Sequence, residues 1–257
     1  MKILAIGDIV GDLGLKKLSE LLPKIIEKEN IDFTIVNAEN TSGGMGLTQK
    51  DFDTLQKMKI DVFTMGNHTW GKKDIFSFID NPKLLRPANY SKGVPGKGYN
   101  IYQCKDKKIA VINLIGRTDM NILSENPFLL AKDLVAKLQK EADIIVVDFH
   151  AEATAEKIAM KHFLDGKITV LFGTHTHVQT ADAEITEQGT GYITDLGMTG
   201  AINSVIGMDV KASIKRFVTS LPERYKLAEG NAMLNGCVFE INDDNCKTEK
   251  IYAISYK

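Results

Sequence analysis

Short apolar runs recur along this chain, and each ends abruptly at polar residues. Runs of this length predict buried strands, and the segments between them, 15–26 and 52–58, have helical periodicity. Thr48 is a candidate N-cap for the second helical segment, and Pro23 predicts a kink or a break in the first. The alternation of strand and helix indicates an α/β fold. The apolar runs are 3–8 (ILAIGD), 33–40 (FTIVNAEN), 62–68 (VFTMGNH), 144–150 (IIVVDFH) and 168–177 (ITVLFGTHTH).

Two further segments predict β-hairpins, which make the expected sheets mixed. Residues 99–116 contain two strand-like stretches around a turn at 105–107, and residues 236–256 contain two more around a turn at 242–245. Residues 81–98 hold three prolines, three glycines and a serine, which predicts a long surface loop over the site. With no repeat or clear linker, we expect residues 1–257 to form one domain.

Charge and composition favour a small substrate in the cytoplasm. Lysine plus arginine (32) nearly balances aspartate plus glutamate (33), so no strong field attracts nucleic acid or an anionic membrane. The three cysteines form no C-x-x-C pair and are expected to be reduced. Asp8 interrupts the first apolar run, which predicts a first strand and not a signal peptide.

The residues at which the runs stop are all of types that bind metals or transfer protons. In open α/β sheets, ligands bind beyond the carboxyl ends of the strands, so these residues are expected to converge. Four of the five histidines follow apolar runs directly, and His162 is the exception. A single histidine is more often structural, but the set favours a functional site. The residues are Asp8, Glu39, Asn40, Asn67, His68, His150, His175 and His177.

A mixed set of oxygen and imidazole ligands suits iron, manganese or zinc. The candidate ligands are more than one ion needs, whereas two ions about 3.5 to 4 Å apart can clamp the attacking and leaving oxygens of a phosphoryl displacement. Glu39 is the candidate bridge between them. His175 and His177 would point in opposite directions on an extended strand, so a loop must turn both inward, and Gly173 helps to permit that.

Several motifs resemble those of the calcineurin-like metallophosphoesterase superfamily. They are G-D-x-x-G at 7–11, G-N-H at 66–68, His150 and T-H-T-H at 174–177. Three longer segments resemble the YmdB-like branch: N-A-E-N at 37–40, T-S-G-G-M-G-L-T at 41–48 and L-G-M-T-G-A-I-N-S-V-I-G-M at 196–208. Val10 replaces the usual histidine of D-x-H, Glu39-Asn40 replaces the usual bridging aspartate, and Thr69 follows G-N-H in place of an acid. These departures favour the YmdB-like branch over a protein phosphatase.

The resemblance implies a four-layer αββα sandwich with two ions, iron first and manganese or zinc as alternatives. It implies Asp8, Glu39, Asn40 and His177 as ligands of the first ion. For the second ion it implies Glu39, Asn67, His150 and His175. His68 is left over as a general acid or a charge stabiliser, with orientation of Asn67 as the alternative.

The implied activity is hydrolysis of 2′,3′-cyclic nucleotides to 3′-nucleotides by a homo-oligomer, a dimer or a tetramer. One alternative is a phosphomonoesterase acting on phosphoserine, phosphothreonine or small molecules. Another is a regulatory or RNA-associated metal-binding protein with little activity. The glycines of 41–46 could let backbone amides approach a phosphate or could form a simple turn, and 196–207 could border the ions or simply pack.

Overall fold

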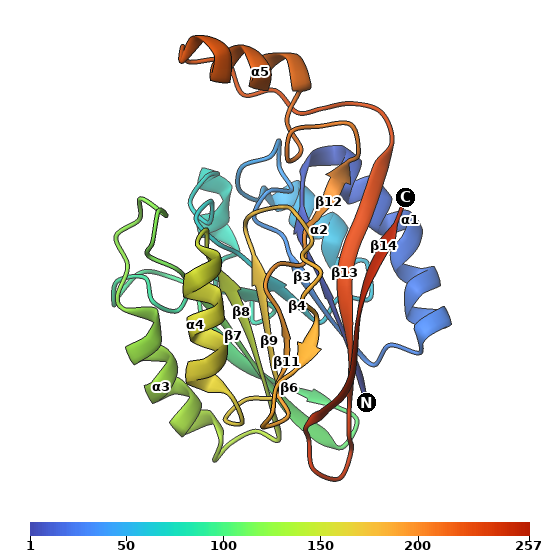
Figure 1. The fold of residues 1–257 in the computed structure, drawn as a ribbon, viewed down its shortest axis with the longest axis vertical. Coiled ribbons are helices and arrows are strands. Elements are labelled where there is room, and N and C mark those ends of the chain that lie inside the picture. The colour runs from blue at the N-terminus through green and yellow to red at the C-terminus, as the bar shows by residue number, and fades with distance from the viewer.

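Two β-sheets lie face to face, with helices on their outer faces, in the computed structural model, which describes residues 1–257 (Figure 1). α1 (Gly11–Glu29) and α2 (Gln49–Gln56) contribute to one apolar cluster with the first sheet. α3 (Pro127–Leu138) and α4 (Thr154–Leu164) contribute to another with the second sheet. This arrangement confirms the predicted α/β class, its mixed sheets and the four-layer αββα sandwich. No helix is both long and apolar enough to cross a membrane.

The first sheet has eight strands in the order β2-β12-β13-β1-β3-β4-β5, with β14 paired to β13. β1, β3, β4 and β5 pair in parallel, and the antiparallel pair β13–β14 is the predicted C-terminal hairpin. Its strands are β1 (Lys2–Ile6), β2 (Asp8–Ile9), β3 (Phe33–Asn37), β4 (Val62–Thr64), β5 (Leu84–Leu85), β12 (Met198–Ala201), β13 (Ala232–Ile241) and β14 (Thr248–Tyr256).

The second sheet has six strands in the order β10-β11-β9-β8-β7-β6. β6 and β7 form the predicted antiparallel hairpin, and Lys105 takes the left-handed φ of 53° at its turn, where a glycine is usual. β7, β8, β9 and β11 pair in parallel. The strands are β6 (Tyr99–Cys104), β7 (Lys107–Ile115), β8 (Ile144–His150), β9 (Val170–Thr174), β10 (Glu184–Ile185) and β11 (Gly191–Ile193).

Strand β1 shows how the apolar runs build the layers. Ile3 and Ala5 belong to the cluster between the two sheets, whereas Leu4 and Ile6 belong to the cluster beneath α1 and α2. Because successive side chains of a strand point to opposite faces, a run buried on both sides must be apolar throughout. The continuous runs in the sequence are therefore the central strands of a sandwich.

Two local features differ from expectation: the break considered at Pro23 and the loop over residues 81–98. α1 continues through Pro23 to Glu29 without a break. Pro23 is exposed, and its neighbours Leu22 and Ile25 bury the inner face of the helix, so tertiary packing outweighs the lost hydrogen bond. Residues 81–98 are not simply a surface loop over the site, because they include the buried strand β5 at the edge of the first sheet.

The two remaining helices differ in burial, since the first contributes Ile75 to the apolar cluster of the first sheet and the second has no buried residue. The short 3₁₀ helix η1 (Lys73–Ser77) follows the G-N-H segment. α5 (Val210–Thr219) is capped by Asp209, whose side chain accepts a hydrogen bond from the Ala212 amide. Figure 1 shows α5 on an arm that projects away from the sandwich, and none of its residues is buried.

Candidate metal centre

The polar residues at the strand ends meet where the carboxyl edges of the two sheets come together. Asp8 starts β2, Glu39 and Asn40 follow β3, and Asn67 follows β4, all from the first sheet. The second sheet contributes the remaining residues. The structure thus gathers all seven predicted ligand residues into one cluster, completed by His150 at the end of β8 and by His175 and His177 after β9. Their binding of metal stays a prediction.

One half of the cluster is centred on the buried His150 imidazole. Its Nε2 lies 3.1 Å from Glu39 Oε1, 2.8 Å from Asn67 Oδ1 and 3.0 Å from His175 Nδ1. A neutral imidazole Nε2 carries at most one hydrogen and cannot satisfy all of these neighbours. Electron-rich nitrogen and oxygen atoms therefore face one another, and a bound cation would remove the repulsion between them.

The spacing of these atoms fits an ion. Ligand atoms about 2.0 to 2.2 Å from a metal are separated from one another by roughly 3 Å. The three separations around His150 Nε2 are all close to that value. The ligating atoms of Glu39, His150 and His175 also lie within 4.8 Å of one another. This half of the cluster can therefore hold a metal with little rearrangement.

The other half of the cluster joins Asp8, Asn40 and His177. The Asn40 Nδ2 atom lies 3.1 Å from His177 Nε2 and 3.4 Å from Asp8 Oδ1, and His177 Nε2 lies 3.7 Å from the same Asp8 oxygen. The His177 Nδ1 atom lies 2.8 Å from the Ile206 carbonyl oxygen. That carbonyl accepts the hydrogen of Nδ1, so Nε2 is the ring nitrogen that faces Asn40 and Asp8.

Glu39 is fully buried between the two halves. Its Oε1 atom lies 3.1 Å from His150 Nε2 and accepts a hydrogen bond from Asn40 Nδ2 at 3.3 Å. Its Oε2 atom accepts the His68 backbone N–H at 3.0 Å. A carboxylate in contact with both sets of ligands is placed to bridge two ions.

Gly66 makes room for this packing. A Cβ atom at this position would lie 2.3 Å from the His150 ring and 2.4 Å from Glu39 Oε2. Only glycine lets the G-N-H turn approach both side chains so closely. The glycine of this motif is therefore explained by the site.

His175 and His177 have left-handed backbones, with φ of 102° and 66°. Such conformations cost non-glycine residues roughly 1 to 3 kcal/mol each and persist only where the surroundings hold them. The sequence analysis predicted that a loop must turn both side chains inward. The left-handed backbone at His175 and His177 produces this turn. The strained backbone lies directly at the candidate centre.

The pKa values describe charged carboxylates beside histidines of two kinds. Burial opposes ionisation of Glu39, but His150 and His68 hold its pKa well below the usual value. Burial also opposes protonation of His177, yet its interaction with Asp8 raises its pKa to about 9. Burial and the neighbouring His150 lower the pKa of His175 to about 3. The anionic carboxylates and the neutral His175 are the forms that bind cations.

His68 is held at the edge of the cluster. Its Nδ1 atom lies 2.7 Å from Asn40 Oδ1 and 3.5 Å from Glu39 Oε1, and its side chain is 28% exposed. The Nε2 atom has no hydrogen-bond partner in the protein. His68 contacts Asn40 and not Asn67, so the structure does not support the alternative that it orients Asn67.

Several supporting residues were missed by the sequence analysis. Asp148 is fully buried, and it accepts a hydrogen bond from Thr174 Oγ1, which lies 2.9 Å from His150 Nδ1. Burial raises the pKa of Asp148 to about 6. Glu152 Oε2 lies 3.1 Å from His175 Nε2 and leaves Nδ1 facing His150. The position of Asp148 inside the apolar run 144–150 could have indicated a buried carboxylate near the site. No comparable sequence pattern marks Glu152.

Two segments border the candidate metal centre: the glycine-rich segment 41–46 and the segment 196–207. Gly43, Gly44 and Gly46 have positive φ values, and Gly46 donates its N–H to the Glu39 carbonyl. The amides of Gly43 and Gly44 donate to no protein group. The other segment supplies the Ile206 carbonyl that holds His177.

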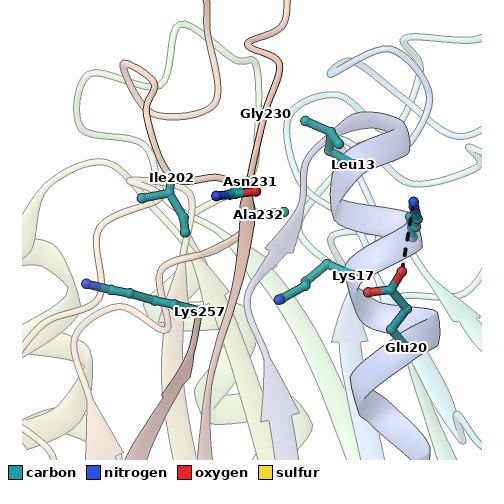
Figure 2. Close-up of a pocket in the computed structure, with 9 residues that line it drawn as sticks. Leu13, Lys17, Glu20, Ile202, Gly230, Asn231, Ala232 and Lys257 are labelled. Atoms are coloured by element: carbon teal, nitrogen blue, oxygen red, sulfur yellow. Dashed lines mark ion pairs between the residues drawn. The ribbon is translucent and has the colours of Figure 1, made fainter.

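A separate cleft lies away from the cluster. It has a volume of about 440 Å³ and lies along α1, where Figure 2 shows Lys17 and Lys257 on opposite sides. Glu20, which also lines this cleft, is paired with Lys16. The cleft contains none of the candidate ligands. A smaller cleft of about 290 Å³ is lined by Val10, Gly43 and Leu227 and therefore borders the segments that carry Asp8 and Asn40. The size of a cleft does not locate the chemistry here.

Comparisons with known proteins match nearly the whole chain. A family model described as YmdB-like protein matches residues 4–254. A Bacillus subtilis protein named 2′,3′-cyclic-nucleotide 2′-phosphodiesterase is 49% identical over 255 residues, which are 99% of this chain and 96% of the relative. A solved structure of a phosphatase from Mycoplasma pneumoniae has a TM-score of 0.94 at 37% identity, covering 99% of this chain and 92% of that chain. The solved structure of a hypothetical protein from Thermus thermophilus has a TM-score of 0.93 at 33% identity, covering 100% of this chain and 99% of that chain.

Proposed function

The chain belongs to the YmdB-like protein family, and on that premise we propose that it is a two-metal phosphodiesterase that hydrolyses 2′,3′-cyclic nucleotides to 3′-nucleotides. The observation that carries the proposal is the convergence of six other ligand-type side chains around the buried carboxylate of Glu39, which contacts His150 and Asn40 directly. The activity named for the Bacillus subtilis relative supplies the substrate class. The phosphatase from Mycoplasma pneumoniae supports the same general chemistry of phosphoric esters.

The two ligand sets follow the two halves of the cluster and share Glu39. Asp8, Asn40 and His177 complete the first set, and Asn67, His150 and His175 complete the second. The mixture of oxygen and imidazole donors suits iron, manganese or zinc, and of these we propose iron. The chemistry that two ions supply when bound is Lewis-acid polarisation of the phosphate and activation of water.

His68 is the residue that we assign to the proton at the leaving oxygen. Its Nδ1 is held by Asn40, and its free Nε2 belongs to a side chain that is partly exposed. In the proposed reaction water adds to phosphorus and releases a proton to solvent, and the bond from phosphorus to O2′ breaks. The imidazolium form of His68, whose Nδ1–H is donated to Asn40, protonates O2′ from Nε2. The product keeps its phosphate on O3′.

The surroundings of the cluster suit a nucleotide. The free amides of Gly43 and Gly44 can donate to phosphate oxygens. The adjoining cleft of about 290 Å³ is partly apolar, with Val10 and Leu227 among its lining residues, and can receive a nucleoside.

We also propose that residues 1–257 form a single domain, since both sheets contribute to one apolar cluster between them.

A panel of substrates tests the proposed reaction. Protein loaded with iron or Mn²⁺ is expected to convert 2′,3′-cyclic AMP to 3′-AMP faster than it hydrolyses 3′,5′-cyclic AMP or p-nitrophenyl phosphate. Product identity is read by chromatography against 2′-AMP and 3′-AMP standards. Preference for p-nitrophenyl phosphate would identify a phosphomonoesterase instead. No turnover by protein with two bound ions would favour a regulatory metal-binding role.

The exposed arm is the surface through which we propose that copies of the chain assemble. On α5, Phe217 and Val218 are each 78% exposed, and no residue of the helix is buried. An isolated helix of this length is marginal in water, so a partner is needed to hold it. Exposed apolar side chains gather on the arm, and an apolar patch of this kind marks a protein–protein interaction site. These side chains are Ile206, Val210, Ile214, Phe217, Val218, Leu221 and Tyr225.

Replacing Phe217 and Val218 together by serine is expected to convert the oligomer to a monomer. Multi-angle light scattering during gel filtration measures the mass directly. Lys211→Ser on the same helix is the control and is expected to leave the mass unchanged. A wild-type monomer, or an oligomer that survives the double substitution, would contradict assembly through the arm.

A further inference from the structure

Two buried charged residues, Lys157 and Asp195, lie directly behind the loop that carries His175 and His177. Lys157 on α4 is 1% exposed, and Asp195, between β11 and β12, is 0% exposed. Their Nζ and Oδ2 atoms are 2.7 Å apart. Neither side chain is a candidate ligand. Buried ion pairs are weak evidence for stability, so this pair calls for another explanation.

Asp195 connects the histidine loop to the strand end that carries Asp8. Its Oδ2 atom accepts the N–H of Thr176, the peptide between the two histidines, at 3.1 Å. Its Oδ1 atom accepts the N–H of Gly197 at 2.8 Å. The Gly197 carbonyl in turn accepts the N–H of Asp8 at 3.2 Å. One carboxylate therefore sets the relative position of backbone from both halves of the cluster.

Lys157 holds the same loop one residue earlier. Its ammonium group donates to the Thr174 carbonyl at 2.9 Å, immediately before His175. A Cβ atom at position 173 would lie 2.9 Å from Lys157 Cδ and 1.9 Å from the Thr194 carbonyl oxygen, so Gly173 lets the lysine pack beneath the strand. Hydrogen bonds from the ion pair therefore hold the backbone on both sides of His175, at Thr174 and at Thr176.

We propose that the Lys157–Asp195 pair is a positioning device for the metal centre, which holds the left-handed backbone at His175 and His177 so that each imidazole faces its ion. The inference rests on the proposed two-metal function. The hydrogen bonds of the pair end on the loop backbone at Thr174 and Thr176, and these are the contacts that a device for fixing backbone geometry needs. A pair serving only the core would have no need to contact this loop.

The same helix provides a matched control. Lys161, one turn after Lys157, forms an ion pair of equal length, 2.7 Å, with Glu184. That pair is more exposed and makes no hydrogen bond to the loop 174–177. Lys161→Met therefore removes a lysine ion pair from α4 without touching the backbone of the histidines.

Metal binding tests the proposal without relying on activity. Co²⁺ is titrated into metal-free protein against a chromogenic chelator, and its visible absorption reports the coordination geometry. We expect Lys157→Met/Asp195→Asn, which removes both buried charges, to bind Co²⁺ about 10- to 100-fold more weakly and with an altered spectrum. Lys161→Met is expected to match the wild type in both.

The outcomes separate this inference from the proposed function. Wild-type protein that binds no Co²⁺ would contradict the proposed function itself. A folded double variant with wild-type affinity and spectrum would overturn the positioning role and leave the function untouched. If the double variant does not fold, the near-isosteric Asp195→Asn is tested by the same Co²⁺ titration, with the same outcomes for or against the positioning role. This substitution replaces one of the two oxygens that accept the Thr176 and Gly197 amides, and it weakens the bond to Lys157.

Discussion

Glutamine in place of Glu39 is expected to reduce hydrolysis of 2′,3′-cyclic AMP by about 10³-fold or more and to release at least one ion. The substitution keeps the shape of the side chain but removes the charge that contacts both ligand sets. Lewis-acid stabilisation by a metal is worth several kcal/mol, and each 1.4 kcal/mol is about tenfold in rate. Elemental analysis and initial rates on the same preparation measure both effects.

Glu240→Gln is the matched control for this substitution. Glu240 is partly buried and paired with Lys2 and Lys250, far along β13 from the site. The Glu240→Gln variant is expected to keep full metal content and activity. A circular dichroism spectrum of each variant shows whether it is folded. A Glu39→Gln protein that binds two ions and retains full activity would show that Glu39 does not bridge.

Removing the His68 side chain is expected to slow turnover while leaving the ions bound. His68→Ala should lose about 10² to 10⁴ in kcat, the usual range for a positioned general acid. The reason is that its free Nε2 is the proton donor assigned to O2′, whereas its Nδ1 contacts Asn40 and is not directed at an ion in our assignment. Steady-state rates and metal content of one preparation give the answer.

His162 supplies the control for the histidine substitution, since it is exposed in the last turn of α4 and outside the cluster. His162→Ala is expected to have wild-type kcat and metal content. Loss of an ion from His68→Ala would instead make His68 a ligand or the residue that orients Asn40. An unchanged kcat would remove it from the reaction.

The layers of the fold could be predicted from the sequence because the signal was local. A run such as 144–150, apolar until its last residues, is buried on both faces, and the ligand-type residue at its end lies at the edge of the sheet. The order of the strands could not be predicted, since β12 and β13 reach the first sheet from the far end of the chain. Their pairing depends on contacts between distant segments, which no local pattern specifies.

The errors have the same origin. Pro23 and the prolines of 81–98 are local signals for breaks and loops, but burial of Leu22 and Leu84 outweighs them. The supporting residues of the site were missed for a related reason. Lys157 and Glu152 look like ordinary surface residues in the sequence, and only the packing of α4 and β8 brings them to the histidine loop.

Titration of metal-free protein with Mn²⁺ or Fe²⁺, with turnover of 2′,3′-cyclic AMP measured at each addition, tests the two-metal account most directly. Activity is expected to appear mainly with the second equivalent of metal per chain, and 3′-AMP is the expected product. Full activity at one equivalent, or turnover by the protein without metal, would contradict the two-metal account.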